Sequence, residues 1–214
     1  MWVKICGWRT EEMLEAALAA GARPDAIGLN FFAGSPRATT VEIARRVVER
    51  HSAQLEPVGL FVDHSVPSIL EIAEACGIRT LQLHGDYPAS ELLPLREFRV
   101  IRVYRLPGAS LDPVAEDLAA CRRAGLAPWA CLVEPKVDRA FGGTGTLGPW
   151  ELLRGWPAEF PPLLLAGGLT PQNVTEAIRT VRPWGVDTAS GVERDRGMKD
   201  QALVKAFIDA ARSA

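Results

Sequence analysis

The stretch LLLAGGLTPQNVTEAIRTVRPWGVDTASG (residues 163–191) contains the unit from which the fold follows. A short apolar run leads into a glycine pair, then into a segment where Val, Ala and Ile recur at helical spacing, then into a second apolar run. The apolar runs have the length of buried strands, and the segment between them has the period of an amphipathic helix. The stretch therefore predicts a strand, a helix and a second strand, the unit that joins parallel strands.

The same alternation occurs eight times along the 214 residues. Strands are expected at Val3–Cys6, Ala26–Phe31, Pro57–Val62, Thr80–His84, Val100–Arg105, Trp129–Glu134, Leu163–Ala166 and Val186–Ser190. Helices are expected at Glu11–Ala20, Val41–Ser52, Val66–Cys76, Ala89–Phe98, Pro113–Ala124, Leu147–Leu153, Pro171–Arg182 and Asp200–Arg212. Eight units with no linker between them predict an α/β fold, a single (β/α)8 TIM barrel over residues 1–214, with a doubly wound sheet as the alternative.

Several helices have recognisable starts. Thr39 stands three residues before Glu42, the spacing of a capping box. Asp112 and Thr170 each precede a proline, which suits the first turn of a helix.

Composition excludes several classes of protein. The 24 Lys and Arg residues against 26 Asp and Glu leave a formal net charge of −2, so nothing indicates nucleic-acid binding. With 48% hydrophobic and 23% charged residues, the chain is typical of a globular protein with a core. It contains no run of about 18 apolar residues, as a membrane span needs, and no signal peptide, so the expected location is the cytoplasm. The four cysteines and three histidines form no metal-binding or redox motif.

Polar residues fall where a barrel of this kind places its active site, after the carboxyl ends of the strands. Cys6, His84 and Glu134 end predicted strands, and Arg37 lies in the loop after the second. Because alternate residues share a face of a strand, His84 is expected to point inward with Gln82.

The same alternation places Lys4 below Cys6, where its charge could favour the thiolate. Glu134 closes an apolar run, so its carboxylate must be paired, hydrated or raised in pKa. The plainer interpretations are a small buried residue for Cys6 and a hydrogen-bonded core residue for His84.

Two glycine-containing loops follow the last two strands, at Gly167-Gly168 and at Ser190-Gly191. Their backbone N–H groups are candidates for holding a phosphate, although tight turns alone would also use glycine. A third cluster, at Gly142–Gly145, is interpreted as a mobile lid or hinge that includes Gly143 and Gly145, or as a plain flexible turn.

Eight segments carry a resemblance that runs in order along nearly the whole chain. They are VKICG (3–7), SPR (35–37), VGLFV (58–62), LQLHG (81–85), GGTG (142–145), LAGGL (165–169), VDTASGVE (186–193) and GMKD (197–200). Together they resemble the phosphoribosylanthranilate isomerase family. The resemblance implies an isomerase of tryptophan biosynthesis that converts N-(5-phosphoribosyl)anthranilate to 1-(2-carboxyphenylamino)-1-deoxyribulose 5-phosphate. This is an Amadori rearrangement, and it needs no cofactor and no metal.

The resemblance also implies roles for individual residues. Cys6 is the general base that takes the C2′ proton, and Glu134 is the general acid that protonates the ribose ring oxygen. Arg37 meets the anthranilate carboxylate, while His84 and Asp187 line the substrate site. The backbone around Gly167, Gly168, Ser190 and Gly191 holds the phosphate.

One departure from the family concerns the acid. The family usually has Asp where the sixth strand ends, and this chain has Glu134, with Asp138 as an alternative acid. Because a misplacement of about 1 Å can cost about a hundredfold in rate, the extra methylene raises a question about turnover.

Two other functions stay open. One is a different phosphosugar activity on the same barrel, such as an epimerase or a two-substrate isomerase shared with histidine biosynthesis. The other is a phosphate-ligand binding protein without turnover. The expected partner is a small phosphorylated aminosugar, with no nucleic acid and no membrane. The sequence leaves open the oligomeric state and any association with other enzymes of the tryptophan pathway.

Overall fold

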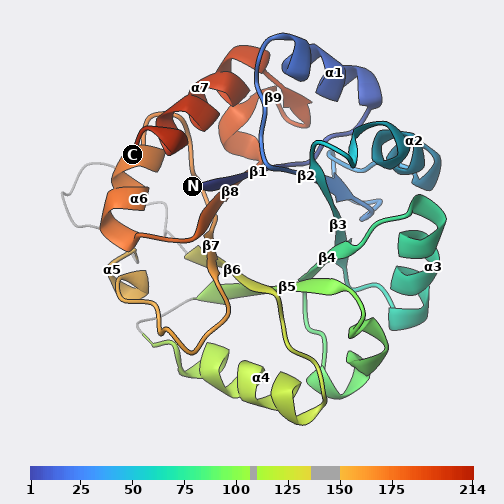
Figure 1. Cartoon of the computed structure of the whole chain (residues 1–214), viewed down its shortest axis with the longest axis vertical. Helices are drawn as coiled ribbons and strands as arrows, with labels where there is room; N and C mark the ends of the chain where they lie inside the picture. Colours follow the sequence, from blue (N-terminus) through green and yellow to red (C-terminus); the bar gives the residue numbers. More distant parts are fainter. Residues whose placement is uncertain (107–109, 136–149) are drawn as a thin grey trace.

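The chain forms a closed barrel of parallel strands surrounded by helices in a computed structural model, which describes residues 1–106, 110–135 and 150–214 (Figure 1). The barrel strands are β1 (Trp2–Cys6), β2 (Ala26–Asn30), β3 (Glu56–Val62), β4 (Thr80–His84), β5 (Arg99–Leu106), β6 (Ala130–Pro135), β7 (Leu163–Leu165) and β8 (Gly185–Thr188). Each strand pairs with the next, and β8 pairs with β1, so the sheet closes on itself. The predicted (β/α)8 barrel is confirmed, and the doubly wound alternative is wrong.

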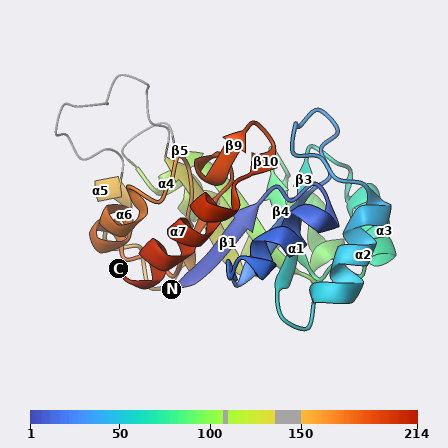
Figure 2. The same ribbon diagram turned by 90° about the horizontal axis from the view of Figure 1, so that it is seen from above.

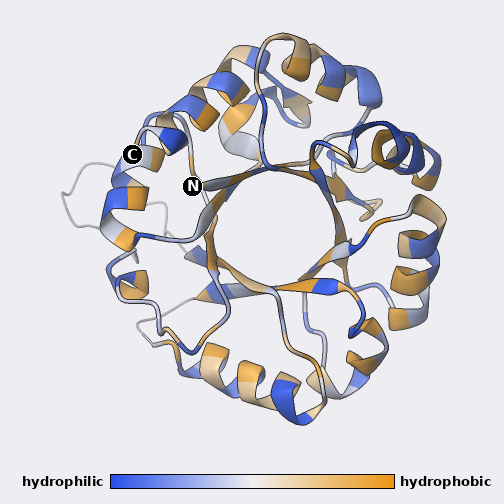
Figure 3. Ribbon diagram, viewed as in Figure 1, coloured by the Kyte–Doolittle hydropathy of each residue, from blue (hydrophilic) through white to orange (hydrophobic). Residues whose placement is uncertain are grey.

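The helices are α1 (Glu11–Ala19), α2 (Val41–His51), α3 (Val66–Cys76), α4 (Asp112–Arg123), α5 (Trp150–Leu153), α6 (Val174–Val181) and α7 (Gln201–Arg212). Short 3₁₀ helices are η1 (Ala89–Glu91), η2 (Leu93–Leu95) and η3 (Ser190–Val192). Hydrophilic residues recur along the helices that ring the barrel (Figure 3). In the part of the chain that the structure describes, no helix has the length and hydropathy to cross a membrane.

Alternate strand residues build two apolar layers. Inward-facing residues such as Ile101, Leu132 and Leu164 fill the barrel, whereas Leu81 and Leu83 pack with the helices outside it. Burying one such side chain contributes about 1.5–3 kcal/mol, so this division fixes which residues face inward. Because Leu81 and Leu83 face outward, His84, which alternates with them along β4, faces the interior. The expected orientation of His84 is confirmed.

The amino-terminal end of the barrel is closed by tryptophans. The rings of Trp2 and Trp184 stack with centroids 4.8 Å apart, and Trp129 packs edge-on against both, at 5.8 Å from Trp2 and 5.3 Å from Trp184. Both chain termini lie toward this end in Figure 2, opposite the hairpin of β9 (Glu193–Asp195) and β10 (Met198–Lys199). The candidate polar site residues therefore lie at the other, carboxyl end of the barrel.

Three sequence predictions about helices are wrong. The segment 89–98 is not a continuous helix but η1 and η2, because Pro94 has no N–H and its ring obstructs an α-helix. α6 begins at Val174 rather than Pro171, after a turn in which Asn173 Oδ1 accepts from the Thr170 N–H. The cap of α2 is Thr40, whose side chain accepts from the Ile43 N–H.

Two residues expected at helix starts have other roles. Asp112 is the first residue of α4 rather than its cap. Thr39 turns its hydroxyl away from α2 and donates to the Arg9 carbonyl. Of the predicted helix 147–153, residues 147–149 lie outside the described residues.

Candidate active site

The carboxyl end of the barrel brings together side chains from distant parts of the sequence. Cys6 ends β1, His84 ends β4 and Glu134 is the last inward-facing residue of β6. Asp187 lies in β8 directly beside Lys4 of β1 in the strand register. The structure therefore places the strand-end residues identified from the sequence around one mouth.

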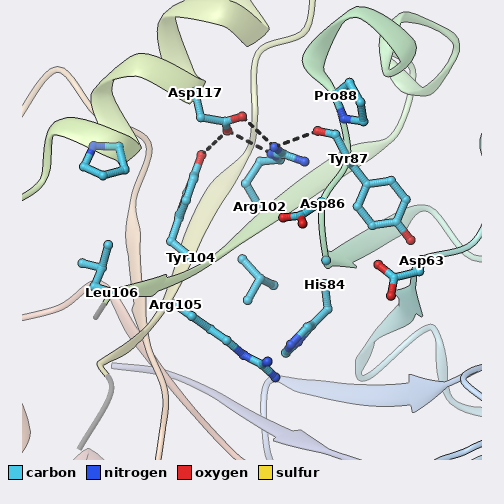
Figure 4. Close-up of a pocket in the computed structure, with 13 residues that line it drawn as sticks. Asp63, His84, Asp86, Tyr87, Pro88, Arg102, Tyr104, Arg105, Leu106 and Asp117 are labelled. Carbon is cyan, nitrogen blue, oxygen red and sulfur yellow. Dashed lines mark hydrogen bonds and ion pairs between the residues drawn. The ribbon is translucent and has the colours of Figure 1, made fainter. Parts of the chain in front are cut away.

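A pocket of about 630 Å³ opens over the ends of β4 and β5 (Figure 4). His84 and Arg105 line it from the barrel interior, and Asp63 lines it from the end of β3. Its other side reaches a cluster beneath α4, where Asp117 binds Arg102 at 2.7 Å and Tyr104 at 2.7 Å. Cys6 and Glu134 do not line this hollow, so it adjoins the candidate catalytic pair without containing it.

Cys6 is buried in an electrostatically mixed environment. Its side chain lies against Gly28 of β2, whose lack of a Cβ makes room for the sulfur. Burial raises the pKa of the Cys6 thiol and the charge of Asp187 raises it further, which together outweigh the lowering effects of Lys4 and Lys199. Lys4 does favour the thiolate, in the expected direction, but burial outweighs it and the pKa of the thiol stays above its ordinary value.

Lys4 is fully buried and forms an ion pair with a carboxylate. Its Nζ donates to Asp187 Oδ1 at 2.9 Å. Burial lowers the pKa of Lys4, but Asp187 more than compensates, so the pKa is raised and the ammonium stays charged. Asp187 opposes the effect of this charge on the neighbouring thiol, but Lys4 remains the largest charge effect that lowers the pKa of Cys6.

Glu134 has a partner that the sequence did not identify. Arg105 pairs with it across β5 and β6, and Arg105 Nε donates to Glu134 Oε2 at 3.3 Å. Figure 4 shows the Arg105 guanidinium close to the His84 ring. Burial lowers the pKa of His84, and the charge of Arg105 also lowers it, against the raising effect of Glu134. His84 is thereby favoured as a neutral imidazole. Arg105 could have been found from the sequence, since alternation from Ile101 and Val103 points it inward.

Arg37 is held by a carboxylate from the other end of the chain. Its Nε and Nη2 donate to the two carboxylate oxygens of Glu193, each at 2.7 Å. Lys199 Nζ also donates to Glu193 Oε1, at 2.8 Å. Burial raises the pKa of Glu193, but the hydrogen bonds from Arg37, Lys199 and Gly197 outweigh it and bring the pKa to about 2.

The two glycine-containing loops after β7 and β8 are tied to each other. Gly167 and Gly168 both have positive φ, 86° and 66°, which glycine adopts without strain. Thr188 Oγ1 donates to the Leu169 carbonyl at 2.7 Å, and a Cβ on Gly191 would collide with that same carbonyl. Among the described residues, none accepts a backbone hydrogen bond from the N–H of Gly167 or Gly168.

Two expectations fall on residues 136–149 and cannot be placed. The proposed lid, with Gly143 and Gly145, lies outside the described residues. So does Asp138, the alternative acid.

One group in the described part of the chain has side chains suited to a metal ion, and it lies away from the mouth. Ligand atoms of Glu11, Glu15 and His51, on α1 and α2, come within 4.8 Å of one another. Arg50 already binds both carboxylates, at 3.0 Å from Glu11 and 2.9 Å from Glu15.

The family model and the sequence relatives agree on one family. The family model for N-(5'phosphoribosyl)anthranilate (PRA) isomerase matches residues 3–210. The N-(5'-phosphoribosyl)anthranilate isomerase of Roseiflexus sp. (strain RS-1) is 40% identical over 220 residues, which cover 99% of this chain and 98% of the relative.

Solved structures agree with the sequence relatives. Phosphoribosyl anthranilate isomerase from Thermotoga maritima superposes with a TM-score of 0.82 at 31% identity, covering 99% of this chain and 98% of that one. A phosphoribosyl anthranilate isomerase in complex with reduced 1-(o-carboxyphenylamino)-1-deoxyribulose 5-phosphate has a TM-score of 0.79 at 30% identity, with the same coverage.

Proposed function

Because this chain belongs to the N-(5'-phosphoribosyl)anthranilate isomerase family of tryptophan biosynthesis, we propose that it rearranges phosphoribosylanthranilate with Cys6 as general base and Glu134 as general acid. The family makes the protein an isomerase. The assignment of the two roles rests on the site: a thiol and a carboxylate face the same barrel mouth from β1 and β6. That juxtaposition is the observation that carries the proposal.

One acid and one base suffice for the reaction. Glu134 gives a proton to the ribose ring oxygen, the C1′–O bond breaks, and the electron pair of the anthranilate nitrogen forms the C1′ iminium. The iminium acidifies the C2′ proton, which Cys6 takes to give an enolamine. Moving a proton from O2′ to C1′ then gives the ketone, so substrate and product have the same composition.

The positive charge that forms on the substrate during the reaction complements the environment of Cys6. Cys6 must act as the thiolate, yet burial and Asp187 raise the pKa of its thiol. An iminium beside the sulfur adds a positive charge to that of Lys4, and a nearby opposite charge favours the thiolate. The base is therefore activated at the step that needs it.

The remaining residues have binding roles in this proposal. Arg37 lies at the mouth with its stem against Gly7, next to Cys6, where it can meet the anthranilate carboxylate. His84 and Asp187 line the sugar site. Gly167 and Gly168, with Ser190 and Gly191, offer backbone N–H groups to the phosphate, as loops after the last two strands do in many barrels.

Turnover by wild type and four variants tests the proposal. Freshly generated phosphoribosylanthranilate is mixed with excess enzyme, and the loss of anthranilate fluorescence is followed in a single turnover. Cys6→Ala and Glu134→Ala should each lose about 100-fold or more, whereas Asp138→Asn should stay near wild type. A large loss in Asp138→Asn with Glu134→Ala unchanged would transfer the acid role to Asp138.

The fourth variant, Glu134→Asp, decides between an enzyme and a binding protein. If wild type is inert and Glu134→Asp gains activity, the chain is a family member that binds its ligand without turnover. The cytoplasmic location and any association with other enzymes of the tryptophan pathway stay predictions.

A further inference from the structure

The hairpin of β9 and β10 contains two charged residues that have no role in the proposed reaction. Glu193 and Lys199 occupy the two strands of the hairpin and pair with each other in its register. Both side chains are almost completely buried, with 4% of Glu193 and 1% of Lys199 exposed. Buried charges are kept in proteins where they are paired, and this pair is joined to Arg37.

The contacts join the hairpin to two parts of the mouth. Lys199 Nζ donates to the Ala189 carbonyl at 2.8 Å, which fixes the hairpin to the end of β8. The same ammonium donates to Glu193, so the carboxylate is anchored before it reaches Arg37. The Gly197 N–H adds a third donor to Glu193, at 3.1 Å from Oε2.

Two glycines allow the backbone of neighbouring segments to pack closely against Arg37 and Pro36. A Cβ on Gly197, which has φ of 85°, would lie 2.4 Å from the Pro36 carbonyl oxygen. A Cβ on Gly7, with φ of 90°, would lie 2.7 Å from Arg37 Cδ. Arg37 is thus confined between the residue that follows Cys6 and the turn of the hairpin.

We propose that Glu193 and Lys199 are positioning residues that hold the Arg37 guanidinium at the mouth for the carboxylate of the substrate. The inference rests on the proposed function. Glu193 takes the Nε and Nη2 donors of Arg37, and no described residue accepts a hydrogen bond from Nη1. Arg37 therefore presents its remaining donors on Nη1 and Nη2 to the substrate from a fixed guanidinium, and its side chain needs little ordering when the substrate binds.

The expected effect is on binding rather than on the chemical step. Glu193→Gln removes one charged partner from Arg37, and KM should rise about tenfold with kcat within about threefold of wild type. Lys199→Met should shift KM in the same direction by less, because Arg37 keeps its bidentate partner. The matched control is Asp195→Asn, in the same hairpin, whose carboxylate is 70% exposed and pairs with Arg194.

A double-mutant cycle with Arg37→Ala separates positioning from a general structural role. If Glu193 acts through Arg37, then Glu193→Gln in the Arg37→Ala background should change KM by less than about twofold. Losses that multiply, or a fall in kcat at unchanged KM, would overturn the proposal. A fall in KM would overturn it as well, because Glu193 would then compete with the substrate for Arg37.

Binding of reduced 1-(o-carboxyphenylamino)-1-deoxyribulose 5-phosphate to the same variants keeps this test independent of turnover. If wild type binds this analogue without catalysis, the proposed function fails, and the ratio of Kd values between wild type and Glu193→Gln still decides the positioning role. If wild type does not bind it, both proposals fail.

Discussion

Replacing Gly28 by alanine should disable Cys6, the proposed general base, while the barrel stays folded. Gly28 pairs with Cys6 in the register of β1 and β2, and an added Cβ would lie 2.6 Å from Cys6 Sγ and 2.9 Å from Cys6 Cα. Ordinary contacts between such atoms are about 3.5–4.0 Å, so the thiol must move by roughly 1 Å. A misplacement of about 1 Å can lower kcat about 100-fold, or about 2.7 kcal/mol in activation free energy.

The same crowding has a separate cost in stability. Overpacking of this kind costs about 1–3 kcal/mol, and each kcal/mol lowers Tm by about 2–4 °C in a chain of this size. The control is Gly59→Ala in β3, whose Cβ would meet the Phe61 ring at 2.9 Å, on the helix side and away from the thiol. It should lower Tm by a similar amount and leave kcat near wild type.

Single-turnover kinetics well below Tm, with thermal unfolding followed by circular dichroism, distinguish the two effects. A Gly28→Ala variant with kcat within threefold of wild type would refute the reasoning, because it would show that the sulfur can move without losing its role. An equal loss of kcat in Gly59→Ala would also refute it, since crowding alone would then explain the result.

Three further predictions concern the buried charges. Arg102→Met leaves Asp117 without its partner and should lower the free energy of unfolding by about 3 kcal/mol, as measured by urea denaturation. The ion pairs of Glu193, with its folded pKa of about 2, stabilise the fold above the ordinary value of 4.5 and are lost as pH falls toward 2. The difference in unfolding free energy between wild type and Glu193→Gln should therefore shrink from pH 4.5 to pH 2. Asp187→Asn removes a charge that raises the pKa of Cys6, so alkylation of Cys6 near pH 8, followed by mass spectrometry, should be faster than in wild type.

Each of these three predictions would be contradicted by a specific result. Arg96→Met is the control for Arg102→Met, because Arg96 is 58% exposed and pairs with exposed Glu97; an equal loss there would mean that burial is irrelevant. For Glu193→Gln, a difference that widens as the pH falls would have the wrong sign. For Asp187→Asn, alkylation at the wild-type rate would show that Asp187 does not influence the thiol.

The fold could be predicted because hydrophobic period is local information. Each strand alternates or runs apolar over four to eight residues and each helix repeats on one face, so β4 and α3 are predicted to the residue. The hairpin of β9 and β10 was missed because ERDRGMK (193–199) has no apolar alternation. It is held by the buried charges of Glu193 and Lys199, and Glu193 also pairs with Arg37, which is distant in the sequence.

The positions of the site residues could be predicted from the sequence, but the residues with which they interact could not. Alternation within a strand places His84 and Glu134 at the mouth, because a strand residue's face depends only on its neighbours. The contact between Arg37 and Glu193 spans 156 residues and depends on how β2 and β8 are arranged around a closed sheet. The same holds for Lys4 and Asp187, 183 residues apart, whose charges act on Cys6 in opposite directions.

Glu134, the proposed general acid, is a position where a shorter side chain can be tested with little effect on the surrounding structure. Arg105 and Glu134 are 69% and 31% exposed, and ion pairs this accessible contribute about 0–1 kcal/mol to stability. Glu134→Asp withdraws the carboxylate by one methylene, so we expect it to lose the contact with Arg105 at little cost to the fold. A change in its turnover would therefore report the reach of the acid toward the ring oxygen, and not a loss of structure around it.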